Sequence, residues 1–346
     1  MTTHLTIQNH PYFDFSKPID PQAIAGEDQL LSDLVATPAL KRLQSIRFLG
    51  GIDYVLIRSP NGAKGNVRYT RYQHSLGVTR LAINYSRERN LSSTDRRLIC
   101  AAALLHDIGH APLSHSLEPA FENMFGLEHH RATEDVIRGR SPIGNEICHI
   151  LHHYRVDVEH LVAIISGQEL AYDGFFSGPI NFDTIEGILR SQAFLRPSPS
   201  NQCPEAVATA ALRREDTRDR RIVDDFWHSK DWIYRHVINS RAGILADYAC
   251  QLFMRRNPEN IKASDYFGSE DQIFRKLPGL LQLLTSPSFE SDIFKLLDAP
   301  ITFSSRRYFV DQDTDFFARR DLQRYRQERR QQLLYPSANP EFERGQ

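Results

Sequence analysis

An adjacent histidine–aspartate pair, His106-Asp107, closes an apolar stretch of the chain and constrains the fold more than any other feature. Leu98, Ala102 and Leu105 precede the pair at helical spacing, which predicts a helix with one buried face. Burying an imidazole and a carboxylate costs several kcal/mol unless something pairs them. A divalent cation would pair both, because each is a metal ligand and open coordination positions would hold water and substrate. The alternative is a core histidine next to an aspartate that caps a helix.

Helical spacing of apolar residues recurs along most of the chain, whereas the alternation typical of strands is scarce. Val78, Leu81 and Tyr85, for example, share one face of a predicted helix. Pro112 is predicted to end the helical pattern around the histidine–aspartate pair, because proline disfavours helical geometry in the residue before it. The glycines and proline of residues 51–73 favour a small β-hairpin or a long loop. Further helices are predicted near residues 113–125, 130–138, 145–153, 157–166, 183–191, 220–253 and 270–284. The predicted fold class is therefore all-α.

The length of 346 residues suggests two or three domains, or one large one. We expect an N-terminal arm over residues 1–30 and a helical core over 31–200. A helical C-terminal region over 201–335 is expected to pack on the core, and residues 336–346 are expected to form a flexible tail.

The charge balance is nearly even, with 42 Lys and Arg against 43 Asp and Glu. That balance argues against a general nucleic-acid binder or a binder of anionic membranes, whose surfaces are usually basic. One exception is the arginine-rich segment 319–330, which we predict to be a basic, solvated helix. The alternative for this segment is contact with a nucleotide, a phosphate backbone or a partner subunit.

The lack of a recognisable targeting signal predicts a cytoplasmic, soluble protein without a membrane partner. The first residues have no basic region followed by an apolar run, so no signal peptide is expected. The apolar stretch 98–105 is far shorter than the ~20 residues that span a bilayer.

Histidines are concentrated in one part of the sequence: ten of the 14 lie between His74 and His160. His74, on the preceding predicted helix, is a candidate third ligand beside the histidine–aspartate pair. Asp183 is the best candidate for a fourth ligand. A second metal ion is the alternative to a single one, because six further histidines are available for it: His129, His130, His149, His152, His153 and His160.

Three segments extend this pattern well beyond four residues. They are residues 37–50 (TPALKRLQSIRFLG), 71–78 (RYQHSLGV) and 106–115 (HDIGHAPLSH). Together they resemble the HD-domain metal-dependent phosphohydrolases, in particular the deoxynucleotide triphosphohydrolase branch, over about residues 30–250. The resemblance implies an all-α HD core, a homo-oligomer and a divalent metal, with Mg, Mn, Fe, Zn, Ni and Co as candidates. It implies that the metal ligands are His74, His106, Asp107 and Asp183.

The same resemblance implies roles for further residues. In related enzymes a histidine works with an acid three residues on, and these are His115 and Glu118 here; that spacing places both on one side of a helical turn. The family's other catalytic histidines, which line the phosphate site, correspond to His110 and His130. Arg71 would complement the negative charge of a phosphate. Residues 227–247 resemble a helix that supplies phosphate-binding groups, and its candidates are Arg235 and Arg241.

Other positions depart from the deoxynucleotide triphosphohydrolase pattern. The family usually has Gln where this chain has Phe48, and that Gln helps to bind the sugar. It usually has Lys, Tyr and Asp where this chain has Thr184, Gly187 and Ser191. The positions for metal binding and proton transfer are therefore kept, and those that contact the sugar are changed.

The leading hypothesis is a metal-dependent phosphohydrolase that acts on a nucleotide and releases triphosphate or phosphate. One alternative is a phosphomonoesterase or phosphodiesterase for a cyclic or non-nucleotide phosphoester. A further alternative is a non-catalytic regulator that binds a nucleotide or nucleic acid, with nucleic acid the less favoured partner.

Overall fold

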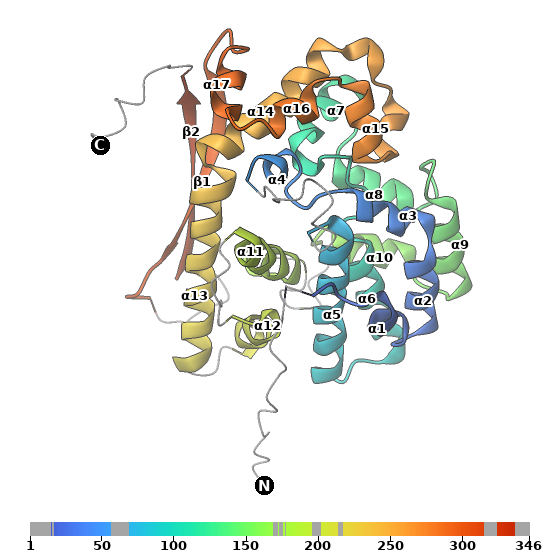
Figure 1. Cartoon of the computed structure of the whole chain (residues 1–346). Helices are drawn as coiled ribbons and strands as arrows, with labels where there is room; N and C mark the ends of the chain where they lie inside the picture. Colours follow the sequence, from blue (N-terminus) through green and yellow to red (C-terminus); the bar gives the residue numbers. More distant parts are fainter. Residues whose placement is uncertain are drawn as a thin grey trace.

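The computed structural model describes residues 15, 17–56, 69–168, 172, 176, 178–195, 202–213, 217–314 and 324–335. Within them the chain is a body of helices with one two-stranded ribbon on its side (Figure 1). The all-α class predicted from the sequence is confirmed. None of the described helices is long and apolar enough to cross a membrane.

The first half of the chain builds the part of the core that carries the histidines. Its helices are α1 (Pro21–Ala25), α2 (Gln29–Ala36), α3 (Pro38–Arg42), α4 (Gly51–Leu56), α5 (Arg71–Glu88), α6 (Ser93–Leu105), α7 (Glu118–Phe125), α8 (His129–Ile137), α9 (Asn145–His153) and α10 (Val158–Ile165). α5 packs against α6, and the Thr70 side chain caps its first turn by accepting from the amide of Gln73. Most of α5 is buried, which places its polar residues inside the protein.

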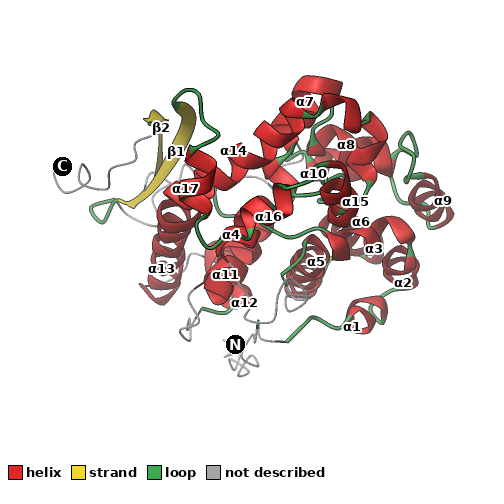
Figure 2. Ribbon diagram, turned by 45° about the horizontal axis from the view of Figure 1, so that its top comes forward, coloured by secondary structure: helices red, strands yellow, loops and turns green. Residues whose placement is uncertain are grey.

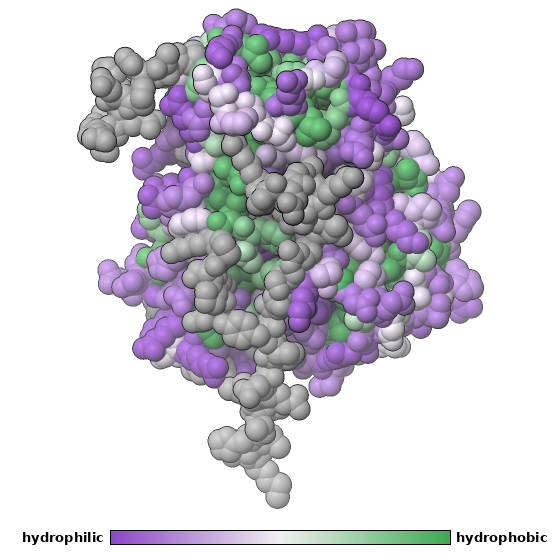
Figure 3. All heavy atoms as spheres, in the orientation of Figure 1, coloured by the Kyte–Doolittle hydropathy of each residue, from purple (hydrophilic) through white to green (hydrophobic). Residues whose placement is uncertain are grey.

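The second half closes over α5 from the other side. Its elements are α11 (Phe182–Leu195), α12 (Pro204–Arg213), α13 (Thr217–Ile233), α14 (Arg241–Arg256), α15 (Glu270–Lys276), α16 (Leu280–Leu284), α17 (Phe289–Phe294), β1 (Ile301–Val310) and β2 (Tyr325–Leu334). α11 packs on α5, and α14 packs on α4, so the C-terminal half covers the N-terminal half directly. Figure 3 shows a mainly hydrophilic face, with hydrophobic residues gathered near α16.

Pro112 does not end the α6 helix as expected: α6 ends at Leu105, and His106 is its C-cap. Polar side chains replace the helical hydrogen bonds beyond this point. The Arg42 guanidinium donates to the carbonyls of Ile108 and His110, both at 2.8 Å. The histidine–aspartate pair therefore lies at the start of a turn, where its side chains are not confined to one helix face.

Residues 51–73 are not a hairpin in their described part. Residues 51–56 form α4 and α5 begins at Arg71, whereas residues 57–68 lie outside the described residues. The predicted helix 220–253 is two helices, because a π-helical turn (Tyr234–Ile238) follows α13 and Ser240 caps a new helix. The predicted helix 270–284 is also divided, at Pro278 and at Gly279, whose φ is 88°.

The basic helix predicted over 319–330 is wrong in its described part, since residues 325–334 form β2. β2 pairs antiparallel with β1, from Val310 opposite Tyr325 to Ile301 opposite Leu334 (Figure 2). β1 is rich in β-branched and aromatic residues, and Trp227 of α13 packs against both strands at Tyr308 and Tyr325. Pairing and packing thus override the helical preference of the arginines and glutamines of β2. The C-terminal region expected to be helical over 201–335 therefore ends in strands.

Candidate metal and catalytic centre

Four side chains from three helices or their ends converge at the centre of the protein. His74 lies on α5, His106 and Asp107 follow α6, and Asp183 is in the first turn of α11. The Nε2 atom of His74 is 3.0 Å from Asp183 Oδ1, 3.2 Å from His106 Nε2 and 3.7 Å from Asp107 Oδ2. One atom of each of His74, His106 and Asp107 lies within 4.8 Å of the others, as in a metal site. The structure thus brings together all four residues predicted to be ligands.

The four proposed ligands are accessible to solvent on one side only. The His74 side chain is fully buried and those of His106 and Asp107 are nearly so, whereas the Asp183 side chain is 47% exposed. Two imidazole nitrogens and two carboxylates suit a divalent transition metal, with the Asp183 side left for water and substrate. The donor set therefore fits the metal that the sequence predicts.

A second layer of polar groups orients the proposed ligands. His74 Nδ1 is 2.5 Å from Glu186 Oε2, and Glu186 is also bound by the buried Arg190. The carbonyl of Ala103 lies 2.8 Å from His106 Nδ1, so each histidine turns its Nε2 toward the centre. Such partners select the tautomer and orientation of a ligating histidine.

The surroundings shift the pKa values of His74 and Asp107 in opposite directions. Burial would lower the pKa of His74, but Asp183 and Glu186 raise it to about 9. Burial would raise the pKa of Asp107, but His106 and Arg71 hold it well below its usual value. Carboxylates therefore stay ionised here and draw a proton onto His74 when no metal is bound. A divalent cation would replace that proton.

A second cluster lies beside the first and contains His110, His115, Glu118 and His129. His115 Nδ1 is 2.9 Å from Glu118 Oε2, and His129 Nδ1 is 2.5 Å from Glu118 Oε1. The rings of His110 and His129 stack with centroids 4.4 Å apart. His110 Nε2, at 3.2 Å from Asp107 Oδ1, connects the two clusters.

The second cluster differs from the prediction in one residue. His129, named only for a second metal, makes the contact with Glu118. His130 is exposed, and its ring lies against that of His129, with centroids 3.9 Å apart. Both follow the N-cap Glu128 in α8, and adjacent residues on a helix point to different sides. The helical period could have selected His129. Ala132, Thr133 and Val136 are buried and lie three, four and seven residues after it, on the same face of α8.

Burial lowers the pKa of His115 and of His110, and for His115 the Glu118 carboxylate only partly offsets this effect. Burial would raise the pKa of Glu118, but hydrogen bonds from His115 and His129 hold it well below its usual value. The His115 side chain is nonetheless 57% exposed, so it lies on the open side of the cluster. A neutral, accessible imidazole backed by a carboxylate is able to exchange protons near neutral pH.

The predicted phosphate-binding arginines have different positions. Arg71 is buried and donates to Asp107 Oδ2 at 2.8 Å. Arg235 pairs with Asp231 at 3.8 Å and Arg241 with Glu290 at 3.3 Å, so the structure does not bring these two to the centre through the contacts described. Lys230 on α13 is nearer: it donates to the carbonyl of Pro179 at 2.8 Å, just before α11.

Lys230 is buried, and burial lowers its pKa to about 7 although Asp183 attracts the charged form. Lys230 lies within the segment 227–247 that resembles a phosphate-binding helix, but the sequence predicted Arg235 and Arg241 for that role. Its nearness to Asp183 follows only from the packing of α11 on α13.

Three of the four residues that depart from the family pattern, Phe48, Gly187 and Ser191, are connected by direct packing or through Tyr69. The Phe48 ring lies against His74, with centroids 4.6 Å apart, and a Cβ at Gly187 would be 2.8 Å from its Cζ atom. The hydroxyl of Tyr69 is hydrogen-bonded to Ser191 at 2.8 Å. An aromatic ring at residue 48 thus needs glycine at residue 187, and together they give this wall of the centre an apolar surface.

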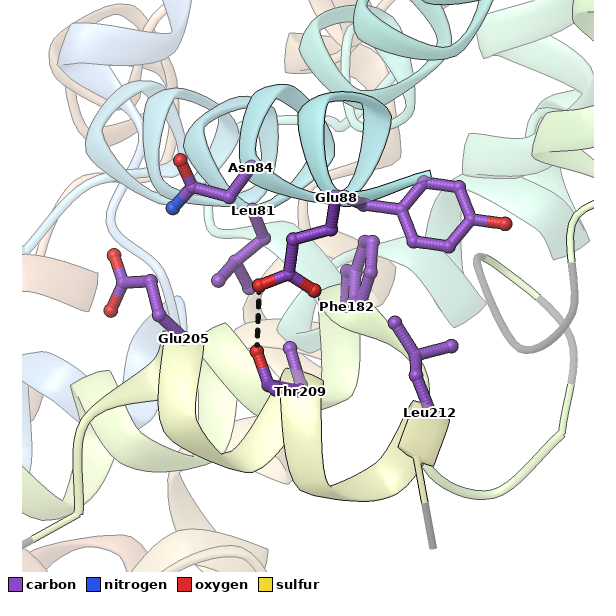
Figure 4. Close-up of a pocket in the computed structure, with 9 residues that line it drawn as sticks. Leu81, Asn84, Glu88, Phe182, Glu205, Thr209 and Leu212 are labelled. Atoms are coloured by element: carbon purple, nitrogen blue, oxygen red, sulfur yellow. Dashed lines mark hydrogen bonds between the residues drawn. The ribbon is translucent and has the colours of Figure 1, made fainter. Parts of the chain in front are cut away.

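A separate pocket between α5, α11 and α12 is too small for a nucleotide. Its volume is about 20 Å³, room for about one water molecule. Figure 4 shows its polar rim, where the Thr209 hydroxyl donates to Glu88 at 3.2 Å. None of the proposed ligands lines it.

Residues 71–172 match the family model of the HD domain. This segment is therefore similar to the HD domain. It contains His74, His106 and Asp107, whereas Asp183 follows it on α11. The match includes every member of the second cluster as well.

Curated relatives are similar to part of the chain. The chain is 32% identical over 194 residues to the uncharacterized protein YwfO of Bacillus subtilis, which covers 55% of this chain and 42% of that protein. It is 34% identical over 167 residues to the deoxynucleoside triphosphate triphosphohydrolase SAMHD1 of Gallus gallus, covering 45% of this chain and 25% of that protein. The chain thus spans less than half the length of these relatives.

Proposed function

We propose that this HD-domain protein is a divalent-metal-dependent phosphohydrolase that acts on a nucleotide in the manner of a triphosphohydrolase. One observation carries the proposal: the donor atoms of His74, His106, Asp107 and Asp183 converge, and the exposed His115 with its partner Glu118 lies in the neighbouring cluster. The similarity to a triphosphohydrolase supports the nucleotide class.

Phosphoester hydrolysis needs a nucleophilic water, neutralised phosphoryl oxygens and a proton for the leaving oxygen. His74, His106, Asp107 and Asp183 would hold a divalent metal, which would supply Lewis acidity for the first two needs. His115, with Glu118 holding its Nδ1 atom, presents Nε2 for proton transfer. Arg71 and His110, which flank Asp107, place further positive or hydrogen-bonding groups near the phosphate. Lys230 is an additional candidate for phosphate binding.

The second candidate is a phosphomonoesterase or phosphodiesterase for a cyclic or non-nucleotide phosphoester. The packing of Phe48 on Gly187 favours it, because neither residue has a side-chain group that forms hydrogen bonds with a sugar. The third is the non-catalytic regulator that binds a nucleotide or nucleic acid through the arginines of residues 319–330. We also expect a homo-oligomer, as the resemblance implies.

A substrate screen tests these proposals directly. Purified protein would be assayed for phosphate or triphosphate release from NTPs, dNTPs, monophosphates and cyclic nucleotides with several divalent metals. We expect turnover in wild type, and a loss of at least about 100-fold in His106→Ala and Asp107→Ala. Bound metal, counted by mass spectrometry, should be one ion per chain, with two as the alternative.

No turnover of any compound, or unchanged turnover in both variants, would sink the enzyme proposal. Binding without hydrolysis, lost when the arginines of 319–330 are neutralised, would favour the regulator. An Arg256→Ala variant serves as a control, since this exposed arginine pairs with Asp298 and is not a candidate for phosphate binding.

A further inference from the structure

The two residues before His115 have a backbone conformation that is rare for residues with a side chain. Leu113 and Ser114 have φ angles of 59° and 47°, both in the left-handed region. Such a residue costs about 1–3 kcal/mol and persists where the surrounding structure over-determines it. Neighbouring groups must therefore hold the Leu113–Ser114 turn.

A carboxylate from the C-terminal half of the chain binds this turn. Glu270, the first residue of α15, is only 3% exposed. Its Oε1 atom accepts from the amide of Leu113 at 3.3 Å and from the amide of Arg47 at 2.8 Å. Its Oε2 atom accepts from the hydroxyl of Tyr54 at 2.6 Å. Glu270 thus accepts hydrogen bonds from three donors at once, which makes it costly to remove.

The other residue of the turn is tied to the same neighbour. The Ser114 hydroxyl donates to the carbonyl of Arg47 at 2.9 Å and accepts from Arg71 Nε at 3.1 Å. Arg47 is therefore held by Glu270 through its amide and by Ser114 through its carbonyl. Arg71 continues the connection to Asp107, the proposed metal ligand.

Close packing leaves the turn little room to move. The carbonyl oxygen of Leu113 would be 2.0 Å from a Cβ atom at Gly50, a contact that only glycine permits. The Leu113 side chain itself is fully buried. A change in the hydrogen bonds of this turn is thus transmitted along the chain to His115 rather than absorbed locally.

We propose that Glu270 is a positioning residue that holds the Leu113–Ser114 turn and thereby aims His115. This inference rests on the proposed function, because it concerns the same proton transfer. Glu270 contacts neither the metal ligands nor His115 in the hydrogen bonds described, and it acts through the backbone. The C-terminal half of the chain, outside the HD domain, would then be required for catalysis as well as for folding.

The test compares three variants in the intact chain. Glu270→Ala removes the acceptor, whereas Glu270→Gln keeps Oε1 for both amides and lets Tyr54 accept from its new amide group. Asp271→Ala is the matched control, since Asp271 is the next residue of α15 and is exposed. Measurements are kcat and KM with the best compound of the screen, metal affinity by calorimetry, and circular dichroism.

We expect kcat to fall about 10- to 100-fold in Glu270→Ala, with KM and metal affinity unchanged, as for a misplaced catalytic group. Glu270→Gln and Asp271→Ala should keep a kcat close to that of wild type. Unchanged kcat in a folded Glu270→Ala protein would overturn the proposal. So would an equal loss in Glu270→Gln, or a loss of metal affinity that parallels the loss of kcat.

A measurement without turnover separates this inference from the proposed function. The imidazole signals of His115 can be titrated by NMR in wild type and in Glu270→Ala. We expect the pKa of His115 to rise toward about 6.5 in the variant, because a released turn admits water. The exposed His149 should not change. An unchanged His115 would overturn the inference even if the protein hydrolysed none of the compounds.

If Glu270→Ala does not fold, Glu270→Asp provides the same test, because the shorter side chain keeps the charge and withdraws the carboxylate from the amide of Leu113. A lower kcat at constant metal affinity would support the proposal. A kcat equal to that of wild type would contradict it.

Discussion

At the scale of single residues, two carboxylates fix the orientation of His74. Asp183 faces its Nε2 atom and Glu186 its Nδ1 atom, so the ring is held from both sides. Glu186 is itself neutralised by the buried Arg190. The two carboxylates thus have different tasks: one faces the proposed metal, and the other orients the ligand.

We predict that Glu186→Gln weakens metal binding about 10- to 100-fold, the usual effect of losing a carboxylate behind a ligating histidine. Calorimetric titration with Mn²⁺ or Zn²⁺ measures the change. Glu88→Gln is the control, because Glu88 lies on the same helix and bonds only Thr209 among the contacts described. Equal affinities in the two variants, with intact folds, would show that Glu186 does not orient His74.

At the scale of elements, the packing of α14 against the turn after His115 depends on a buried carboxyl group. The Ser116 hydroxyl accepts from the amide of Gly51 at 2.9 Å and donates to Asp247 Oδ1 at 2.6 Å. This chain of bonds connects α4, the 3₁₀ turn Ser114–Ser116 and α14. Burial raises the pKa of Asp247 to about 7, although the bond from Ser116 opposes the rise.

We predict that Asp247→Asn stabilises the protein in a pH-dependent way. A folded-state pKa of about 7 above the unfolded value of about 3.9 favours the folded state at low pH, and this advantage is lost as the pH rises to 7. Asn keeps the acceptor for Ser116 and cannot ionise. The variant should therefore match wild type near pH 4 and exceed its Tm increasingly up to about pH 7.

Thermal unfolding at pH 4.5, 6 and 8 would measure this difference. Asp271→Asn, at an exposed position of α15, is the control and should show no trend with pH. A constant difference between wild type and Asp247→Asn at all three values would contradict the prediction.

At the scale of the whole molecule, the strands β1 and β2 are attached to the helical body by α13. Arg324, which precedes β2 and is nearly buried, donates to both oxygens of Asp224 at 2.8 Å. It also donates to carbonyls of the turn after β1, at Asp311 and Thr314. One guanidinium therefore joins α13 to both strands at one end of the ribbon, where Val310 lies opposite Tyr325.

We predict that Arg324→Met lowers the free energy of unfolding by about 3 kcal/mol, because it leaves a partly buried carboxylate without its partner. Arg330→Met is the control: Arg330 is exposed and pairs with Glu328, so we expect a change under about 1 kcal/mol. Chemical denaturation measures both. Equal effects would show that the Asp224 pair does not anchor the ribbon.

By itself, the sequence determined the helical class and the proposed ligands. Both are written in local patterns: a period of 3.6 in the apolar residues, and the spacings within RYQHSLGV and HDIGHAPLSH. A histidine–aspartate pair behind a buried helix needs a partner wherever the rest of the chain lies. The resemblance to the HD-domain phosphohydrolases then selected His74 and Asp183, 109 residues apart, as the further ligands.

Only the tertiary structure decided the rest, because the deciding contacts join distant segments. The choice of His129 over His130 depends on which side of α8 meets Glu118. β2 is a strand because β1 and Trp227 are placed beside it, against the preference of its own residues. Glu270 meets Leu113 across 157 positions of sequence, and no local pattern in either segment records that contact. Local periodicity carries secondary structure and ligand chemistry, whereas the positioning of side chains depends on packing between elements.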